Sequence, residues 1–412
     1  MLEGYTEDKS KQLRGVNHEN KKTVSTVIAL ALVCLWVMPL QAQEALLPSG
    51  ISEDEIGEKI EAFVAEHKAS TTGLSVCVFK KDRILYGGTF GWIDVEKQIP
   101  VAQDSIFEWG SISKLTVWTA AMQLSETGRL DLAADIRDYL PQNFVDQLKY
   151  EKSVTMIDLM NHKGGFEEVV TNLMVKDKAK LLPLPELLIA DQPQQVYAPG
   201  SVTAYSNWST ALAAYVVECV AGEPYDDYVH KHIFAPLQMA DTDFMLGGND
   251  KNLDESVWKQ TKNYSNKGQP LSDTQVYIPL YPAGALAGTI GDLVRFGQAH
   301  LPGQDPTPFK KVTTVQQLFT PTATHTDQVS PINAHGFWSL NYSVPVWGHG
   351  GNTAGQSAHL LLDRASDVGL AIMTNQKGEQ IYNFTLPELI FGPMQNKGET
   401  IPKGFYVSAR SV

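Results

Sequence analysis

Two pairs of β-rich segments, one near each end of the chain, dominate the pattern of apolar and polar positions. The first pair is residues 74–79 and 84–90, on either side of the polar turn Lys80-Lys81-Asp82. The second pair is residues 358–362 and 368–373, which flank a similar turn-like stretch. Short runs rich in β-branched and aromatic residues around a polar turn are typical of β-hairpins. We predict that the two hairpins share one antiparallel sheet.

Helical spacing of apolar residues prevails elsewhere. Ser52 and Glu55 have the spacing of a capping box, and Ile56, Ile60 and Val64 then recur on one helical face. The long middle of the chain shows mainly helical patterns. We therefore predict an α+β fold: an antiparallel β-sheet flanked by helices, plus a mainly helical inserted lobe. The expected sheet lobe covers about residues 45–130 and 326–395, and the expected helical lobe about residues 131–325.

Residues 1–42 have the pattern of a signal peptide with an N-terminal extension. Lys21 and Lys22 precede the uncharged apolar run 23–40, and the small residue Ala42 follows. Cleavage after Ala42 would leave residues 43–412 as the mature domain. The alternative is an uncleaved membrane anchor, which the length of the run just permits. We expect a periplasmic or secreted protein, with membrane contact only through the leader if it is uncleaved.

The charge of the chain argues against a nucleic-acid partner. The 412 residues carry a formal net charge of −13, which has the wrong sign for binding a phosphate backbone. The 43% hydrophobic content suffices for a substantial core. Outside the leader, Cys77 and Cys219 are expected to be buried thiols, with a disulfide between them as the alternative.

A first candidate for chemistry is Gly110-Ser111-Ile112-Ser113-Lys114, which opens a helical pattern. Residues three apart share a helical face, so Lys114 can reach the Ser111 hydroxyl. A serine hydroxyl becomes a nucleophile when a base takes its proton, and a buried lysine with a lowered pKa can act as that base. Taken alone, this spacing is more often a capping serine and a solvated lysine.

Two further segments hold candidate partners. Tyr205-Ser206-Asn207 lies just before the helical pattern of residues 209–221, and Gly348-His349-Gly350-Gly351-Asn352 lies just before the C-terminal hairpin. The paired glycines would let a substrate approach the strand backbone closely. Each segment alone is weakly informative, since Tyr205 fits a core position and His349 fits a turn.

The order S-x-x-K, Y-x-N, H-x-G resembles the three active-site elements of class C β-lactamases and the related D,D-peptidases and esterases. His349 stands where many relatives have the lysine of K-T-G. Four further stretches of the chain also resemble the family: residues 128–141, 155–166, 233–244 and 281–296. With them, the likeness extends over about residues 50–392. The departures are Lys163-Gly164, where threonine and serine are usual, and Gln238 in place of glycine.

The resemblance implies the fold and the chemistry of the serine β-lactamase and penicillin-binding protein-like family. Ser111 would form an acyl-enzyme, with Lys114 and Tyr205 sharing the proton transfers, and which of the two is the base stays open. The backbone amides of Ser111 and Asn352 would form the oxyanion hole. Substrate contacts would come from Asn207, His349, Gly350, Gly351 and Asn352. No cofactor and no metal is required, and we interpret His162 as structural.

The same machinery fits β-lactams, D-amino-acid peptides, other peptide amides and carboxylic esters. We expect an exported serine hydrolase that cleaves an amide or ester bond, with a penicillin-binding-type peptidase or hydrolase as the first interpretation. The alternatives are a carboxylesterase, a class C-like β-lactamase and a β-lactam-binding sensor without turnover. The expected partner is a small-molecule or peptide substrate.

Overall fold

The computed structural model describes residues 45–395, except residues 146–147, 170–171, 247–250, 304, 306 and 326–327. The predicted signal peptide, residues 1–42, lies outside the described residues and stays a prediction. Among the helices of residues 45–395, none is both long and apolar enough to cross a bilayer.

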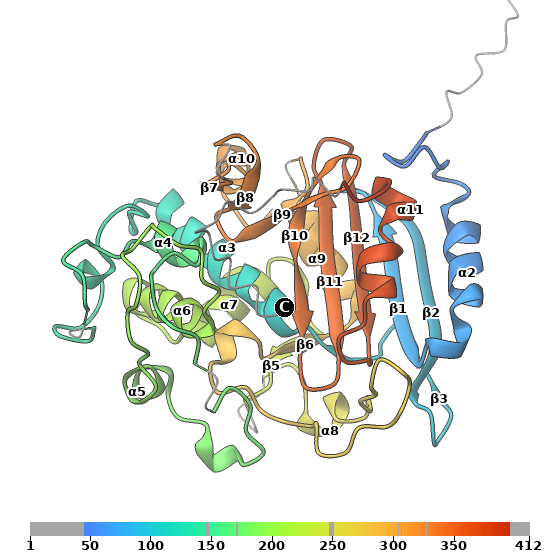
Figure 1. Cartoon of the computed structure of the whole chain (residues 1–412), viewed down its shortest axis with the longest axis horizontal. Coiled ribbons are helices and arrows are strands. Elements are labelled where there is room, and N and C mark those ends of the chain that lie inside the picture. Colours follow the sequence, from blue (N-terminus) through green and yellow to red (C-terminus); the bar gives the residue numbers. More distant parts are fainter. Residues whose placement is uncertain are drawn as a thin grey trace, which may run out of the picture. The chain divides into compact units, whose positions relative to one another are not determined.

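A nine-stranded antiparallel sheet organises the fold (Figure 1). Its strands, in spatial order, are β3 (Ile99–Pro100), β2 (Ile84–Asp94), β1 (Gly73–Phe79), β12 (Val368–Thr374), β11 (Ser357–Asp363), β10 (Pro345–Asn352), β9 (Phe337–Asn341), β8 (Pro331–Ala334) and β7 (Ala323–Thr324). Strand β1 pairs with β12 from Leu74 opposite Thr374 to Phe79 opposite Gly369. Both predicted hairpins are therefore confirmed, and they meet at the centre of one sheet.

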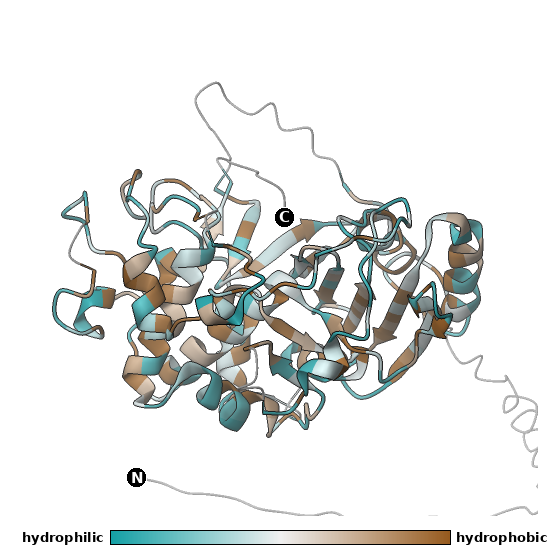
Figure 2. Ribbon diagram, turned by 90° about the horizontal axis from the view of Figure 1, so that it is seen from below, coloured by the Kyte–Doolittle hydropathy of each residue, from teal (hydrophilic) through white to brown (hydrophobic). Residues whose placement is uncertain are grey.

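The two faces of the sheet bury different side chains of the same strands. On β1, Leu74, Val76 and Val78 join one apolar cluster, whereas Cys77 and Phe79 join another. This alternation follows from the two-residue period of a strand. In Figure 2 the strands are mainly hydrophobic, whereas α2 at the edge carries hydrophilic residues.

Helices cover both faces. Helices α2 (Ile56–Glu66) and α11 (Glu388–Phe391) contribute to the first cluster, and α3 (Lys114–Glu126) and α9 (Ile290–His300) contribute to the second. Helix α9 packs directly on β12, β1 and β11, although it lies within the range expected for the helical lobe. The predicted α+β class, with an antiparallel sheet and helices, is confirmed.

The remaining helices lie mainly in the middle of the chain. The α-helices are α4 (Met156–Met160), α5 (Leu184–Ala190), α6 (Asn207–Ala221), α7 (Tyr225–Val229), α8 (Glu255–Trp258) and α10 (Val312–Leu318). The short 3-10 helices are η1 (Lys68–Ser70), η2 (Gly110–Ser113), η3 (Ile136–Asp138), η4 (Lys178–Lys180) and η6 (Tyr281–Ala283), and the π-helical turns are η5 (His230–Phe234) and η7 (Ile381–Thr385). Helix α6 packs against α3, which brings two of the three sequence motifs onto neighbouring helices.

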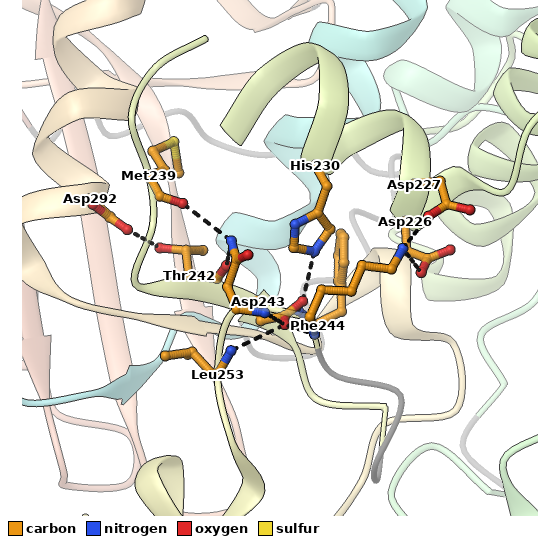
Figure 3. Close-up of polar contacts among 11 residues, drawn as sticks. Asp226, Asp227, His230, Met239, Thr242, Asp243, Phe244, Leu253 and Asp292 are labelled. Carbon is orange, nitrogen blue, oxygen red and sulfur yellow. Dashed lines mark hydrogen bonds and ion pairs between the residues drawn. The ribbon is translucent and has the colours of Figure 1, made fainter. Parts of the chain in front are cut away.

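A second, three-stranded sheet joins β4 (Phe107–Glu108), β6 (Leu286–Gly288) and β5 (Thr242–Phe244). Figure 3 shows Asp243 of β5 as a hub of polar contacts. His230 Nε2 lies 2.8 Å from one carboxylate oxygen, and the backbone N–H groups of Lys251, Asn252 and Leu253 donate to the other. Burial raises the pKa of Asp243, but these hydrogen bonds outweigh it and lower the pKa overall. The ionised carboxylate thus ties residues 251–253 to β5 and η5.

Two local predictions have different outcomes. The capping box is wrong, because Ser52 pairs as an isolated bridge with Leu46 while α2 begins at Ile56 after Glu55. The thiol prediction is confirmed, since Cys77 and Cys219 are both free. Cys77 is buried and Cys219 half-buried, and burial raises the pKa of the Cys77 thiol to about 12.

Two glycines of α9 test the packing of this helix on the sheet. A methyl group at Gly297 would lie 2.6 Å from the Phe79 ring and 3.0 Å from Leu360, whereas one at Gly291 would meet its first neighbour at 3.8 Å. We expect Gly297→Ala to lower the free energy of unfolding by roughly 1–3 kcal/mol through overpacking. Gly291→Ala, the matched control, should be neutral or stabilising by about 0.5–1 kcal/mol. Urea unfolding followed by circular dichroism measures both, and equal midpoints for the two variants would contradict the packing described.

Candidate active site

Ser111 lies in η2, which runs directly into α3, and its backbone lies against the end of β10. Gly110 has φ 53°, and a Cβ there would lie 2.8 Å from Asn352 N. A Cβ at Gly351 would lie 1.9 Å from the Trp109 carbonyl oxygen and 3.2 Å from Ser111 N. Only glycine fits at these two positions without a shift of the backbone. The two glycines thus allow the backbones of Ser111 and Asn352 to lie side by side, where the oxyanion hole is predicted.

The Ser111 hydroxyl contacts both predicted proton carriers. Ser111 Oγ lies 3.0 Å from Lys114 Nζ, and the Tyr205 hydroxyl donates to the same Oγ at 2.7 Å. The Lys114 side chain is fully buried, whereas Ser111 and Tyr205 are half-buried. Three residues from two motifs therefore meet within hydrogen-bond distance, although 94 positions separate Ser111 and Tyr205.

The other partners of Lys114 determine how its amine faces Ser111. Nζ donates to Asn207 Oδ1 at 2.7 Å and to the Ala283 carbonyl oxygen at 2.6 Å. Both oxygens are acceptors, so they engage two N–H groups in either protonation state. The remaining position on Nζ faces Ser111 Oγ, and it is a lone pair in the amine and an N–H in the ammonium. Lys114 can therefore take a proton from Ser111 without rearranging its other bonds.

Glu168 is a site residue that the sequence analysis missed. Its two carboxylate oxygens accept hydrogen bonds from Asn207 N at 2.8 Å and from Asn207 Nδ2 at 2.9 Å. These bonds fix the amide of Asn207 with its nitrogen toward Glu168 and its oxygen toward Lys114. The clue in the sequence is slight: Glu168 lies just after the stretch 155–166 that resembles the family.

Burial decides which group can accept a proton near neutral pH. Burial lowers the pKa of Lys114 from its usual 10.5 to about 7, while the charge of Glu168 opposes this shift. Burial raises the pKa of the Tyr205 phenol above its usual 10, and its hydrogen bond to Ser111 offsets only part of the shift. Near neutral pH the Lys114 amine is therefore better able to accept a proton than the Tyr205 phenol, which keeps its own proton.

His349 lies on β10 and belongs to a stack of aromatic rings. Its Nδ1 lies 2.5 Å from the Gly350 carbonyl oxygen, and Trp338 Nε1 donates to its Nε2 at 3.2 Å. The Trp338 ring stacks on His162 at 5.7 Å, and His162 lies 4.4 Å from the Tyr205 ring. His162 Nδ1 also accepts the backbone N–H of Ser206 at 3.2 Å. His162 thus supports Tyr205, and Trp338, which the sequence analysis missed, links it to His349.

The structure brings the predicted site residues together at the junction of η2, α3, α6 and β10. Ser111, Lys114, Tyr205 and Asn207 are connected by hydrogen bonds, and Gly351 and Asn352 lie against the Ser111 segment. Their roles in catalysis stay predictions at this stage.

The profile of the Beta-lactamase family matches residues 58–390. The chain belongs to this family. Its members are serine hydrolases, and the match covers every residue of the site.

Individual relatives in the Beta-lactamase family are distant. Penicillin-binding protein 4 of Amycolatopsis lactamdurans is 26% identical over 333 residues, which is 77% of this chain and 84% of that protein. Among solved structures, EstCE1, described as a hydrolase with promiscuous acyltransferase activity, has a TM-score of 0.68 at 18% identity, over 82% of this chain and 99% of that one. The D-amino acid amidase of Ochrobactrum anthropi SV3 has a TM-score of 0.65 at 21% identity, over 82% and 97%. These likenesses confirm the fold expected from the sequence.

The pH dependence of the rate tests the pairing of Glu168 with Lys114. With p-nitrophenyl acetate as substrate, kcat/KM should rise with pH through about 7, because Lys114 must lose its proton to act as a base. Glu168→Gln removes a negative charge that favours the ammonium, so this rise should move to lower pH. The plateau should also fall by about tenfold, since a charged hydrogen bond is lost.

Glu167→Gln is the matched control, because Glu167 is the exposed neighbour and carries the same charge. Its profile should coincide with that of the unmodified protein. If kcat/KM of Glu168→Gln rises over the same pH range as that of the unmodified protein, Glu168 does not act on Lys114.

Proposed function

We propose that the protein is a serine hydrolase that cleaves an amide or ester bond through an acyl-enzyme on Ser111. The observation that carries the proposal is the contact of one hydroxyl with a buried amine at 3.0 Å and a phenol at 2.7 Å. Because burial lowers the pKa of Lys114 to about 7, a base is available at neutral pH. Membership of the Beta-lactamase family supports the same chemistry.

In the proposed acylation, neutral Lys114 takes the proton from Ser111 Oγ as this oxygen bonds to the carbonyl carbon. The carbonyl π electrons move to the oxygen, which the N–H groups of Ser111 and Asn352 stabilise. When the electrons return, the bond to the leaving group breaks, and Tyr205 supplies a proton to the departing atom. The Lys114 ammonium restores the Tyr205 proton through a bound water.

In the proposed deacylation, water repeats these steps in reverse. It loses a proton to Lys114 and bonds to the acyl carbon. The ester bond to Ser111 then breaks, and Ser111 Oγ takes the proton back from the Lys114 ammonium. Hydrolysis is then complete, and the site returns to its starting protonation state.

A penicillin-binding-type peptidase or hydrolase is the first candidate for the physiological activity, and its support is the likeness to Penicillin-binding protein 4. A carboxylesterase is the second candidate, supported by the likeness to EstCE1. We also propose that the protein is exported, because residues 21–42 have the pattern of a cleavable signal peptide.

Replacement of the nucleophile tests the acyl-enzyme. Ser111→Ala should reduce hydrolysis of p-nitrophenyl acetate by at least ~10³-fold, because the remaining groups cannot supply a nucleophile. Intact-mass measurement should detect an acyl adduct on the unmodified protein and none on the variant. Ser125→Ala, in the last turn of the same helix, is the control and should retain full activity. Hydrolysis that survives Ser111→Ala would refute the proposal.

A labelled penicillin separates the candidate activities. A persistent adduct on Ser111 favours a penicillin-binding-type enzyme or a sensor, and rapid ring opening favours a β-lactamase. Brisk ester hydrolysis without an adduct favours the carboxylesterase.

A further inference from the structure

The positive charge next to Ser111 has no hydrogen-bonding position left for a substrate. A lysine ammonium has three N–H donors. In Lys114 these face Ser111 Oγ, Asn207 Oδ1 and the Ala283 carbonyl oxygen, and the side chain is fully buried. A substrate carboxylate can therefore pair with Lys114 only if one of these bonds breaks.

His349, the second candidate cation, is held neutral by its neighbours. An indole N–H can only donate, so the bond from Trp338 Nε1 requires His349 Nε2 to be an acceptor. The ring proton must then be on Nδ1, where it is donated to the Gly350 carbonyl oxygen. The contacts thus define the tautomer. Protonation of the ring would place an N–H on Nε2 facing the Trp338 N–H, which is unfavourable. In agreement, burial together with the charge of Lys114 lowers the pKa of His349 to about 3.

The end of β10 beside Ser111 adds no side chain that carries a charge. Gly350 and Gly351 have no side chains, and Asn352 Oδ1 is engaged by the Ser357 hydroxyl at 2.8 Å. On the other side of Ser111, the Glu168 carboxylate is bonded to Asn207. Burial raises the pKa of Glu168, and the hydrogen bonds from Asn207 offset part of this shift. Once Lys114 is neutral and able to act as a base, the Glu168 carboxylate is the group among these residues that can carry a charge, and its ionised form repels an anion.

We propose that the protein selects acyl donors whose leaving group carries no carboxylate. The chemical class is an amide or ester with an uncharged leaving group, such as an amino-acid amide or a simple alkyl ester. This inference rests on the proposed acyl-enzyme at Ser111, and it narrows the candidate activities of that site. It favours a carboxylesterase, or a hydrolase of amides with an uncharged leaving group, over a carboxypeptidase or a β-lactamase, whose leaving groups carry a carboxylate. The sequence predicts that His349 contacts the substrate, and its neutral ring excludes an ion pair with a substrate carboxylate from that contact.

A matched pair of thioesters isolates the charge of the leaving group. The two probes are the N-benzoylglycyl thioester of thioglycolic acid and that of thioglycolamide, which differ only in a carboxylate and a carboxamide. Ser111 Oγ would bond to the carbonyl carbon, the C–S bond would break, and the released thiol is measured with a disulfide reagent. We expect kcat/KM for the carboxamide probe to exceed that for the carboxylate probe by at least about tenfold at low ionic strength, because like charges repel. Added salt should reduce this ratio.

Trp338→Phe tests whether the locked histidine causes the selectivity. Without the indole N–H, His349 Nε2 is free to bind a proton, and the imidazolium can then pair with a carboxylate. The ratio should therefore fall as the pH is lowered, and it should fall further than in the unmodified protein. Trp347→Phe is the control, because Trp347 on β10 packs against Phe319 and should keep the ratio unchanged. A ratio of two rates on one sample does not depend on how much of the variant is folded.

The outcomes separate this inference from the proposed function. If the carboxylate probe is cleaved as fast as the carboxamide probe, and Ser111→Ala abolishes both rates, the substrate inference is refuted and the acyl-enzyme stands. If Ser111→Ala changes neither rate, the proposed function itself is refuted. Failure to cleave either probe also refutes the inference, while the acyl adduct from p-nitrophenyl acetate independently decides the acyl-enzyme. A high ratio that Trp338→Phe leaves unchanged would refute the role given to His349.

Discussion

The chemistry proposed for this protein depends on one buried amine held between two oxygen acceptors. Asn207 Oδ1 and the Ala283 carbonyl oxygen take two of the positions on Lys114 Nζ and direct the third at Ser111. Burial of an amine away from water disfavours its charged form, and the same burial makes it a base near neutral pH. Much of the surrounding structure serves this arrangement. Helix α3 carries the lysine, α6 and Glu168 orient the amide, and η6 supplies the carbonyl.

A second constraint joins the helices to the sheet. Gly110 and Gly351 let two backbone segments approach more closely than any side chain would allow. Beside them, the rings of Tyr205, His162, Trp338 and His349 form a packed series that runs from α6 to β10. The hydroxyl, the amine and the backbone donors are therefore positioned by contacts between the helices and the sheet. A shift of either would change the geometry at Ser111.

The sequence was informative where the cause is local. Both hairpins could be predicted because strand alternation and turn composition act over a few residues, and the pairing of Ser111 with Lys114 follows from helical spacing. Tyr205, Asn207 and the β10 segment could be predicted only by resemblance to the family. Glu168 and Trp338 could not be predicted, because each reaches the site through tertiary contacts. Glu168 binds Asn207, which lies 39 positions further along the chain, and Trp338 contacts His349 from the neighbouring strand. The capping box at Ser52 failed for a different, local reason: Ser52 forms a bridge with Leu46, and α2 begins three residues later than a cap at Ser52 would require.

The pairing of β1 with β12 has a consequence for how the chain folds. This pair of strands in the large sheet joins residues 73–79 to residues 368–374, so residues 80–367 lie between them. Contacts so distant along the chain form slowly, because the intervening loop must close first. The sheet cannot be completed on the ribosome until nearly all of the polypeptide has emerged. If the protein is exported, as we propose, late closure of this kind would keep the chain unfolded long enough to be threaded across a membrane.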